Sequence, residues 1–209
     1  MSKTVWMFPG QGAQKVGMAK DFYENSILAR QLFDEADAAL DFDLKDTCFE
    51  ENEQIHLTEY TQPCLVTACL AMAAELRKRG FRPDMTAGLS LGEYAAIAAA
   101  GGMSPPDAIR LVRKRGLLMQ NTIPAGEGAM CAVLGMETPV IETVLSGVDG
   151  VTIANYNCPG QLVITGRTAA VETAAEKLKA AGARRVVPLK VSGPFHSPLL
   201  ESAGEKLSE

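Results

Sequence analysis

A serine placed between two glycines is the feature that most constrains how this chain can fold. Ser90 lies in the segment Gly88-Leu89-Ser90-Leu91-Gly92, after a strand-like stretch and before a helix of small residues. This G-x-S-x-G pattern in a strand–turn–helix setting is typical of a nucleophile elbow, because the glycines let the backbone turn sharply around the serine. The serine oxygen then projects at a helix N-terminus, whose free N–H groups favour a developing negative charge. A turn that merely caps a helix is the alternative interpretation of these five residues.

Strand-like and helix-like patterns alternate along the first 123 residues. Apolar spacing and turn residues predict strands at 5–8 and 85–89, and helices at 18–40, 58–79, 91–100 and 105–120. Thr58 is expected to cap the second of these helices, and Gly80 to end it. Ser104 is expected to cap the last helix, which then begins with a proline.

A second set of elements follows Pro124. Its order is strand 129–134, helix 138–145, strands 151–154 and 162–165, helix 168–181 and strand 184–189. This βαββαβ order is the ferredoxin-like pattern. We therefore predict an α/β protein in which an α/β-hydrolase-like larger part with a parallel-sheet core, residues 1–123 and 191–209, carries an inserted ferredoxin-like subdomain at 124–190. A last helix is expected to begin after Ser197-Pro198.

Charge and composition exclude several classes of protein. The chain has 20 Lys and Arg against 25 Asp and Glu, a net charge of −5, which argues against a general nucleic-acid binder. No apolar stretch is long enough to cross a membrane, and the N-terminus lacks the apolar region of a signal peptide. The five cysteines follow neither disulfide-framework nor CxxC spacing, so we expect reduced, buried thiols in a cytoplasmic protein: Cys48, Cys64, Cys69, Cys131 and Cys158.

A serine nucleophile needs a base, and the chain has only two histidines. His56 lies in a polar stretch and is predicted to be exposed. His196 lies in a rigid loop, Gly193-Pro194-Phe195-His196-Ser197-Pro198, at the start of a helix. The order of Ser90 and then His196 is that of α/β-hydrolase arrangements, although no acid is convincingly placed between them and a backbone carbonyl could orient the imidazole instead. From these residues alone, His196 could equally be a capping or packing residue.

The helix predicted at 105–120 carries four basic residues. We expect Arg110, Arg113 and Lys114 to form a solvated face. Arg115 differs because the following Gly116 lets another backbone or a ligand approach closely. A buried arginine with no evident acidic partner in the sequence suits a substrate carboxylate, which it can hold through two parallel hydrogen bonds.

The turn Gly10-Gln11-Gly12 offers the backbone N–H of Gln11 as a candidate oxyanion donor. No third glycine follows at the spacing of a dinucleotide-binding loop, and no Gly-Lys-Ser/Thr segment occurs. We therefore exclude a nucleotide-phosphate cradle.

Taken together, these segments resemble the malonyl-CoA:acyl-carrier-protein transacylase family, the acyltransferases of fatty-acid synthesis. The matching segments run in the family's order along the whole chain: Phe8-Pro9-Gly10-Gln11-Gly12-Ala13-Gln14, Thr61-Gln62-Pro63, Gly88-Leu89-Ser90-Leu91-Gly92-Glu93-Tyr94, Arg115-Gly116-Leu117-Leu118-Met119-Gln120, Gly126-Glu127-Gly128-Ala129-Met130, Ala154-Asn155-Tyr156-Asn157-Cys158-Pro159-Gly160-Gln161 and Phe195-His196-Ser197-Pro198-Leu199.

The resemblance implies a role for each matching residue. Ser90 would be the acylated nucleophile and His196 its base. The backbone N–H groups of Gln11 and Leu91 would bind the oxyanion. Arg115 would pair with the malonyl carboxylate, and the other substrate-binding positions implied are Phe195, Met119, Asn157 and Gln62.

The implied reaction is a ping-pong transfer of a malonyl group from malonyl-CoA to the phosphopantetheine thiol of acyl carrier protein. It needs no metal and no cofactor, and we expect a cytoplasmic monomer that binds neither nucleic acid nor a membrane. Because acyl carrier proteins are acidic, this acidic chain must present a local basic patch. The candidates are Lys177, Lys179, Arg184, Arg185 and Lys190, for which a solvated surface is the alternative.

Two departures from the family pattern leave rival functions open. Leu89 stands where the family usually has histidine, and the family continues well beyond Phe195-His196 with further strands, so we expect a C-terminally truncated chain. The rivals are a serine esterase or thioesterase, which Arg115 disfavours, and a truncated, non-catalytic fragment that binds acyl groups or carrier protein.

Overall fold

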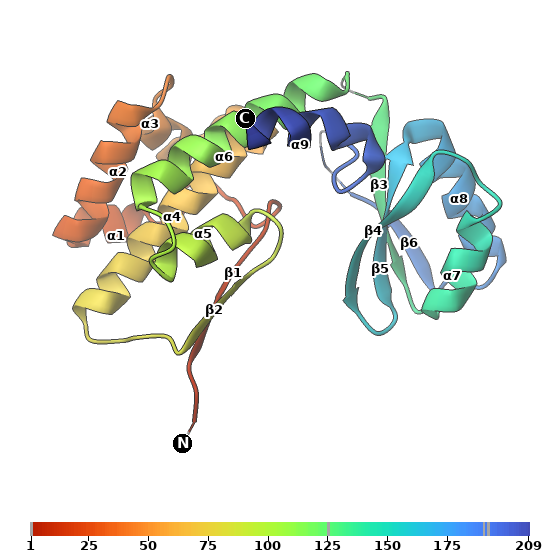
Figure 1. Cartoon of the computed structure of the whole chain (residues 1–209), viewed down its shortest axis with the longest axis horizontal. Coiled ribbons are helices and arrows are strands. Elements are labelled where there is room, and N and C mark those ends of the chain that lie inside the picture. Colours follow the sequence, from red (N-terminus) through yellow and green to blue (C-terminus); the bar gives the residue numbers. More distant parts are fainter. Residues whose placement is uncertain (1, 125, 190, 192) are drawn as a thin grey trace. The chain divides into compact units, whose positions relative to one another are not determined.

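A computed structural model describes residues 2–124, 126–189, 191 and 193–209. The chain is an α/β protein with one parallel and one antiparallel sheet (Figure 1). It divides into two compact units, Met1–Leu117 and Leu118–Glu209. The predicted α/β class is confirmed.

The first unit contains a parallel pair of strands and most of the helices. Strands β1 (Val5–Phe8) and β2 (Met85–Gly88) pair in register from Val5 opposite Met85 to Phe8 opposite Gly88. The helices are α1 (Lys20–Asn25), α2 (Ile27–Ala39), α3 (Leu44–Phe49), the 3-10 helix η1 (Gln54–His56), α4 (Thr58–Lys78), α5 (Gly92–Ala99) and α6 (Pro105–Thr122), the last of which crosses the boundary between the units.

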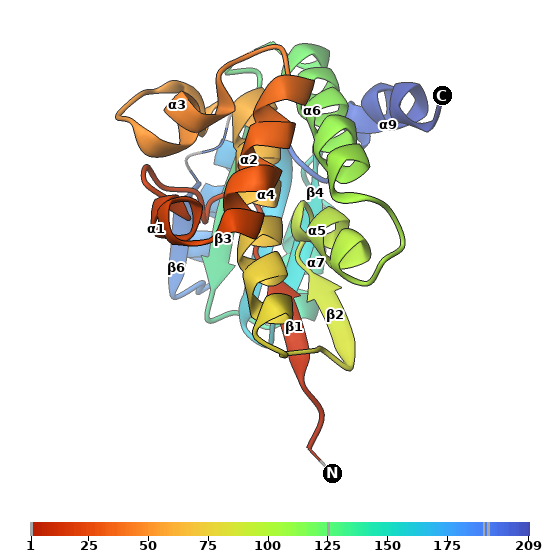
Figure 2. The ribbon, with the colours of Figure 1, turned by 90° about the vertical axis from the view of Figure 1, so that its left-hand side faces the viewer.

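Helix α4 is the centre of the first unit's core. Its sequence is apolar or small nearly all the way round, so the helix is buried on most sides rather than on one stripe. Helix α2 packs along α4, as Figure 2 shows, and α5 packs between α4 and the β1–β2 pair. The fully buried Phe33, Ile55 and Ile109 belong to this core.

The structure corrects two of the predicted helices and adds a third. Residues 18–40 form α1 and α2 rather than one helix, because Ser26 is extended and its hydroxyl accepts a hydrogen bond from the Ala29 N–H at 3.3 Å. The same hydroxyl donates to Glu75 of α4 at 2.6 Å, a partner that the local pattern could not reveal. Helix α3 was not predicted. Thr58 is the first residue of α4, not its cap; Leu57 precedes the helix.

The second unit is a four-stranded antiparallel sheet with helices. Its elements are β3 (Gly128–Leu134), α7 (Thr138–Leu145), β4 (Val151–Cys158), β5 (Gln161–Arg167), α8 (Thr168–Ala180), β6 (Arg185–Pro188), the 3-10 helix η2 (Pro198–Leu200) and α9 (Glu201–Ser208). The strands lie in the order β4-β5-β3-β6. The predicted βαββαβ order of elements is found, with β4 longer than expected because register shifts let it continue beyond Ile153.

Residues 191–209 belong to the second unit, whereas our prediction grouped them with the first part of the chain. The reason lies in packing: Phe195 is 7% exposed and packs against Met130 and Ala132 of β3. Pro194 lies so close to Gly128 that a Cβ at Gly128 would be 2.2 Å from the proline ring. The boundary between the two compact units falls inside α6, between Leu117 and Leu118.

Candidate active site

Ser90 occupies a strained turn between β2 and α5. Its φ is +51°, in the left-handed region that non-glycine residues rarely adopt. A Cβ at Gly88 would lie 2.1 Å from the carbonyl carbon of Gly92, and a Cβ at Gly92 would lie 2.2 Å from the carbonyl oxygen of Phe8. Glycine is therefore required on both sides of the serine, because the first turn of α5 presses against the ends of both strands. This is the strand–turn–helix setting that the elbow interpretation needs.

The loop that carries Gln11 lies beside this turn. Parallel strands bring their carboxyl ends to one edge, and Phe8 at the end of β1 accepts a hydrogen bond from the Leu89 N–H at 3.1 Å. A Cβ at Gly10 would lie 2.8 Å from the Leu89 carbonyl oxygen, so this loop also passes close to the turn. The Gln11 side chain donates to the Thr58 hydroxyl at 3.1 Å. This hydrogen bond fixes the position of Gln11 relative to the start of α4.

Leu91 directly precedes α5 and is 1% exposed. The N–H groups of Gly92, Glu93 and Tyr94 donate to the three preceding carbonyl oxygens of the turn. The Leu91 N–H comes before them at the helix N-terminus, where the helix dipole favours a negative charge. The structure therefore brings three of the predicted residues, Ser90, Leu91 and Gln11, to the carboxyl ends of β1 and β2.

Arg115 lies on α6 and contacts both α4 and α5. Its Nη1 donates to the Gln62 side-chain oxygen at 2.8 Å, and its guanidinium carbon lies 5.5 Å from the centre of the Tyr94 ring. Desolvation lowers the pKa of Arg115 from its ordinary value, although an arginine stays charged in proteins. Among the residues that the structure describes, no carboxylate forms an ion pair with it. Tyr94 was not singled out from the sequence, because only the fold turns α5 toward α6.

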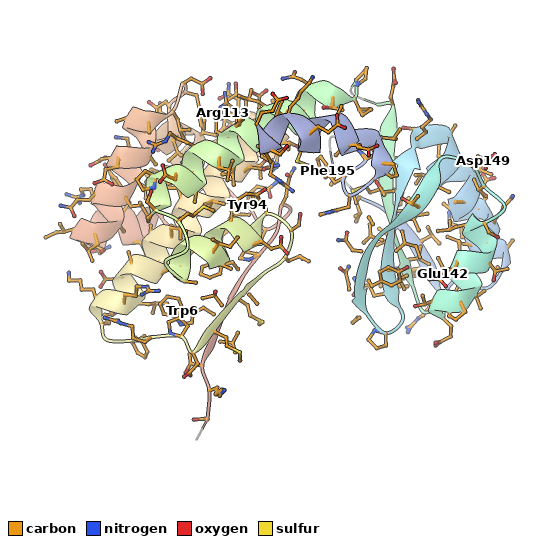
Figure 3. All side chains as sticks on the ribbon, in the orientation of Figure 1. Trp6, Tyr94, Arg113, Glu142, Asp149 and Phe195 are labelled. Atoms are coloured by element: carbon orange, nitrogen blue, oxygen red, sulfur yellow. The ribbon has the colours of Figure 1, made fainter. Side chains whose placement is uncertain are left out.

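The other basic residues of α6 differ from one another. Lys114 is exposed, and Arg110 is exposed and pairs with Asp107, as predicted. The prediction is wrong for Arg113, whose side chain is 9% exposed and forms ion pairs with Asp41 and Glu59. Figure 3 labels Arg113 on α6 and Tyr94 on α5. The sequence could not reveal this burial, because Asp41 lies 72 positions away.

The second unit holds the other predicted site residues. His196 is exposed and has a φ of +57°, while the preceding Phe195 points into a small apolar cluster against which Met119 also packs. Figure 3 labels Phe195 in the segment before α9. Asn157 is exposed near the end of β4. Within this unit, Phe195 and Met119 therefore share one cluster.

Several further sequence expectations can be compared with the structure. His56 is exposed, as predicted. Four of the five cysteines are buried, but Cys158 is exposed because it lies in the last residue of β4, beside a turn. In the described part of the chain, no three His, Cys, Asp or Glu side chains are grouped to hold a metal ion, and no helix is long and apolar enough to cross a membrane.

Four of the five candidates for a basic patch are exposed in the second unit: Lys177, Lys179, Arg184 and Arg185. Lys190 lies outside the described residues.

Comparisons with known proteins identify the family of the chain. Residues 5–209 match the acyl transferase domain family. The chain is 49% identical, over its full length, to the malonyl CoA-acyl carrier protein transacylase of Bacillus subtilis, and it covers 68% of that protein. The crystal structure of a malonyl CoA-acyl carrier protein transacylase from Clostridium perfringens superimposes with a TM-score of 0.93 and 40% identity, over 99% of this chain and 66% of that one.

A further solved structure contains a type II PKS acyl-carrier protein in complex with its malonyl-transacylase. It has a TM-score of 0.95 and 40% identity, over 99% of this chain and 69% of that one. The present chain thus spans about two thirds of the length of the proteins that it resembles.

Proposed function

The chain belongs to the acyl transferase domain family, and from this premise we propose that it moves a malonyl group from malonyl-CoA to the phosphopantetheine thiol of an acyl carrier protein. Two of its relatives, 49% and 45% identical to it, are malonyl CoA-acyl carrier protein transacylases of Bacillus subtilis and Staphylococcus aureus. A solved relative in complex with a carrier protein supports the choice of acceptor.

The observation that carries the choice of a malonyl substrate is the setting of Arg115. Its guanidinium is desolvated, hydrogen-bonded to the Gln62 amide and set against the Tyr94 ring. The nearby charge of Glu93 acts on it, but it forms no ion pair with a carboxylate of the described residues. A cation held in this way favours an anionic ligand, and the planar guanidinium fits a carboxylate through two parallel hydrogen bonds. An esterase for neutral acyl groups has no use for such a group.

In the first half of the reaction, the Ser90 oxygen attacks the thioester carbonyl carbon of malonyl-CoA. His196 takes the hydroxyl proton, and the carbonyl oxygen becomes an oxyanion bound by the N–H groups of Gln11 and Leu91. Each such donor contributes about 3–4 kcal/mol to transition-state stabilisation in well-studied enzymes. The carbon–sulfur bond then breaks, the CoA sulfur receives the proton from His196, and a malonyl ester remains on Ser90.

In the second half, the carrier protein's thiol gives its proton to His196 and attacks the ester carbonyl carbon. The carbon–oxygen bond breaks, and the proton returns to the Ser90 oxygen. The acyl group passes from a thioester to a serine ester and then to a second thioester. No atom is oxidised or reduced in these steps, and the proposed chemistry therefore calls for no cofactor.

The remaining predicted residues fit supporting roles. Phe195 and Met119, which share one apolar cluster, would shape the acyl pocket, and Gln62 would orient Arg115 through its hydrogen bond. Asn157 is exposed and would contact substrate from the end of β4. The exposed Lys177, Lys179, Arg184 and Arg185 are the residues of the described chain that we assign to carrier-protein binding.

The finer description of the fold belongs to the same proposal. The elbow between β2 and α5 supports a hydrolase-like first unit. The order β4-β5-β3-β6 of an antiparallel sheet built from βαββαβ supports a ferredoxin-like second unit.

Intact-mass measurement after mixing the chain with malonyl-CoA tests the proposal. We expect the mass gain of one malonyl group, none in Ser90→Ala, and loss of the adduct when an acyl carrier protein carrying phosphopantetheine is added. Arg115→Gln should lower the loading rate by about 10- to 150-fold, since a hydrogen bond to a charged group contributes about 1.5–3 kcal/mol. Rapid release of free malonate would establish an esterase instead, and an unmodified Ser90 would contradict transfer by this chain.

A further inference from the structure

Arg113 is the most completely enclosed charged side chain of α6. Its Nε and Nη2 donate to the two carboxylate oxygens of Asp41, at 2.8 and 3.0 Å. Its Nη1 donates to both the carbonyl oxygen and the carboxylate of Glu59, at 2.8 and 3.1 Å. The rings of Phe42 and Tyr60 lie 4.8 and 4.9 Å from its guanidinium carbon, so aromatic faces also contact the charge.

The contact with the Glu59 carbonyl arises from a proline. In a regular helix the N–H of residue 63 would bond to this carbonyl, but Pro63 has no N–H. Arg113 supplies the missing donor from a neighbouring helix. The first turn of α4 is therefore held by α6 rather than by its own backbone at this point.

These contacts exclude Arg113 as a ligand for the substrate. Both edges of its guanidinium are bound to protein oxygens. Burial by itself would lower the pKa of Arg113, but the hydrogen bond and charge of Asp41 and the charge of Glu59 outweigh it. The pKa of Arg113 is therefore raised. Arg115, two residues later, has neither carboxylate partner. The two arginines therefore differ in role. Arg113 binds only groups of the protein, whereas Arg115 is the one that we assign to an anionic ligand.

The turn that Arg113 holds carries residues of the proposed active site. Thr58 accepts the hydrogen bond from Gln11, and Gln62 accepts the one from Arg115. Gly116 of α6 packs directly on this turn, because a Cβ there would lie 2.8 Å from the Glu59 Cα and 2.9 Å from the Thr58 carbonyl oxygen. Any displacement of the first turn of α4 relative to α6 therefore moves both Gln11 and the Gln62–Arg115 pair.

We infer that Arg113 is a positioning residue for malonyl recognition. It locks the first turn of α4 onto α6 and thereby aims Arg115 at the carboxylate of the acyl group, while Thr58 on the same turn holds Gln11. This inference rests on the proposed function, since it concerns the alignment of Arg115 with the malonyl carboxylate.

The test compares Arg113→Met with Arg110→Met on the same helix. Methionine keeps apolar bulk beside the Phe42 and Tyr60 rings but removes the hydrogen bonds. Arg110, in contrast, forms an exposed pair with Asp107. For each protein, the rate of Ser90 loading is measured at increasing concentrations of malonyl-CoA and, separately, of acetyl-CoA. Each rate is divided by the amount of enzyme that can be loaded. We expect Arg113→Met to raise the KM for malonyl-CoA about 10-fold or more, because displacements near 1 Å cost up to about 100-fold.

The same variant should leave the KM for acetyl-CoA unchanged, because acetyl has no carboxylate for Arg115. A displacement of Gln11 would instead lower the maximal loading rate for both acyl groups. Arg110→Met should match the original protein with both substrates. A purely structural Arg113 would lower the loadable fraction and leave both KM values as they were, and that result would overturn the inference. Asp41→Asn is the milder second variant, because the Asp41 side chain is 66% exposed and its loss leaves Glu59 in place. It should change the malonyl KM in the same direction.

A second readout keeps the inference separate from the proposed function. The Nε–H resonance of Arg115 in a nitrogen–proton NMR spectrum reports its surroundings without any turnover. We expect it to shift in Arg113→Met and not in Arg110→Met. An unshifted resonance refutes the positioning role even if transfer occurs, whereas a shifted resonance in a chain that is not loaded by malonyl-CoA refutes only the proposed function.

Discussion

At the scale of single residues, backbone strain coincides with the proposed chemistry. Three non-glycine residues of the described chain have positive φ angles: Ala19, Ser90 and His196. Two of them are the proposed nucleophile and base. Strain of this kind costs about 1–3 kcal/mol and persists only where the surrounding structure enforces it. In Ser90 the enforcing contacts are the close approaches at Gly88 and Gly92.

The strain at His196 predicts a difference between two substitutions. His196→Gly should be more stable than His196→Ala by roughly 1 kcal/mol, because glycine adopts the left-handed region without the Cβ clash. Both should lose malonyl transfer by about 100- to 10,000-fold, the usual contribution of a general base. Urea unfolding and transfer assays measure the two effects. Equal stability would show that the observed φ carries no strain, and unchanged transfer would refute the base assignment.

The Arg113–Asp41 pair predicts a pH dependence of stability. The hydrogen bond from Arg113 holds the pKa of Asp41 below its ordinary value, about 3.9. A carboxyl whose pKa is lower in the folded than in the unfolded state stabilises the fold fully above the unfolded-state pKa, and this contribution is lost as the pH falls through the folded-state pKa. Because the Asp41 side chain is 66% exposed, we expect at most about 1 kcal/mol.

Urea unfolding of the original protein and of Asp41→Asn between about pH 7 and pH 2.5 measures this contribution. The variant should be less stable near neutral pH, and the difference should shrink below about pH 4. A difference that stays constant over the whole range would contradict the assignment to Asp41 ionisation.

At the scale of elements, the site depends on how tightly β1, β2 and α5 meet. Leu89 donates to the end of β1, and the first turn of α5 contacts the backbone of Phe8 and Pro9. The second junction of this kind is between α4 and α6. There Gly116 lets the two backbones approach closely, and Arg113 connects the helices through hydrogen bonds and ion pairs. Both junctions put small or charged residues where a larger apolar side chain would separate the elements.

The first junction predicts a strong effect of one methyl group. Gly92→Ala would bring a Cβ within 2.2 Å of the Phe8 carbonyl oxygen and 2.8 Å of that of Pro9. Neither atom belongs to a flexible side chain, so we expect a loss of about 1–3 kcal/mol or more in the free energy of unfolding. Gly204→Ala is the matched control, because the space around Gly204 on α9 is open and alanine favours a helix by up to about 1 kcal/mol. If both variants were equally stable, the close approach would not exist in solution.

At the scale of the whole molecule, the chain has two compact units with separate cores. One core surrounds α4, and the other lies between the antiparallel sheet and the helices α7 and α8. Ser90, Gln11, Leu91, Gln62 and Arg115 belong to the first unit, and His196, Phe195, Asn157 and Met119 to the second. The predicted site residues are thus distributed over the two units.

The burial of the cysteines allows the unfolding of each unit to be followed by thiol labelling. Cys158 is exposed, whereas Cys131 is buried in the second unit and Cys48, Cys64 and Cys69 are buried in the first. Burial raises the pKa of Cys69 to about 11, which keeps its thiolate scarce near neutral pH. Thiol labelling followed by peptide mass analysis should therefore modify Cys158 at once and the other four only as denaturant unfolds their unit. Cys158→Ser should abolish the fast label; rapid labelling of Cys131 or Cys69 in the original protein would contradict the burial described here.

The features that could be derived from the sequence are those that depend on neighbours along the chain. The alternation of strands and helices, the βαββαβ order and the setting of Ser90 all arise from local spacing of apolar residues and from glycines at turns, so they could be predicted. The segments matching a known family extended this to roles, which composition and spacing alone left open for His196.

The tertiary arrangement, in contrast, determines which of two arginines two residues apart forms buried ion pairs and which forms none with the described carboxylates. Arg113 reaches Asp41, which is 72 residues away, while Arg115 meets Gln62 and Tyr94 on two other helices. The break at Ser26, held by Glu75, and the bonding of Thr58 to Gln11 were hidden for the same reason. Burial and hydrogen-bond partners are properties of distant segments brought together, and no periodicity along the chain encodes them.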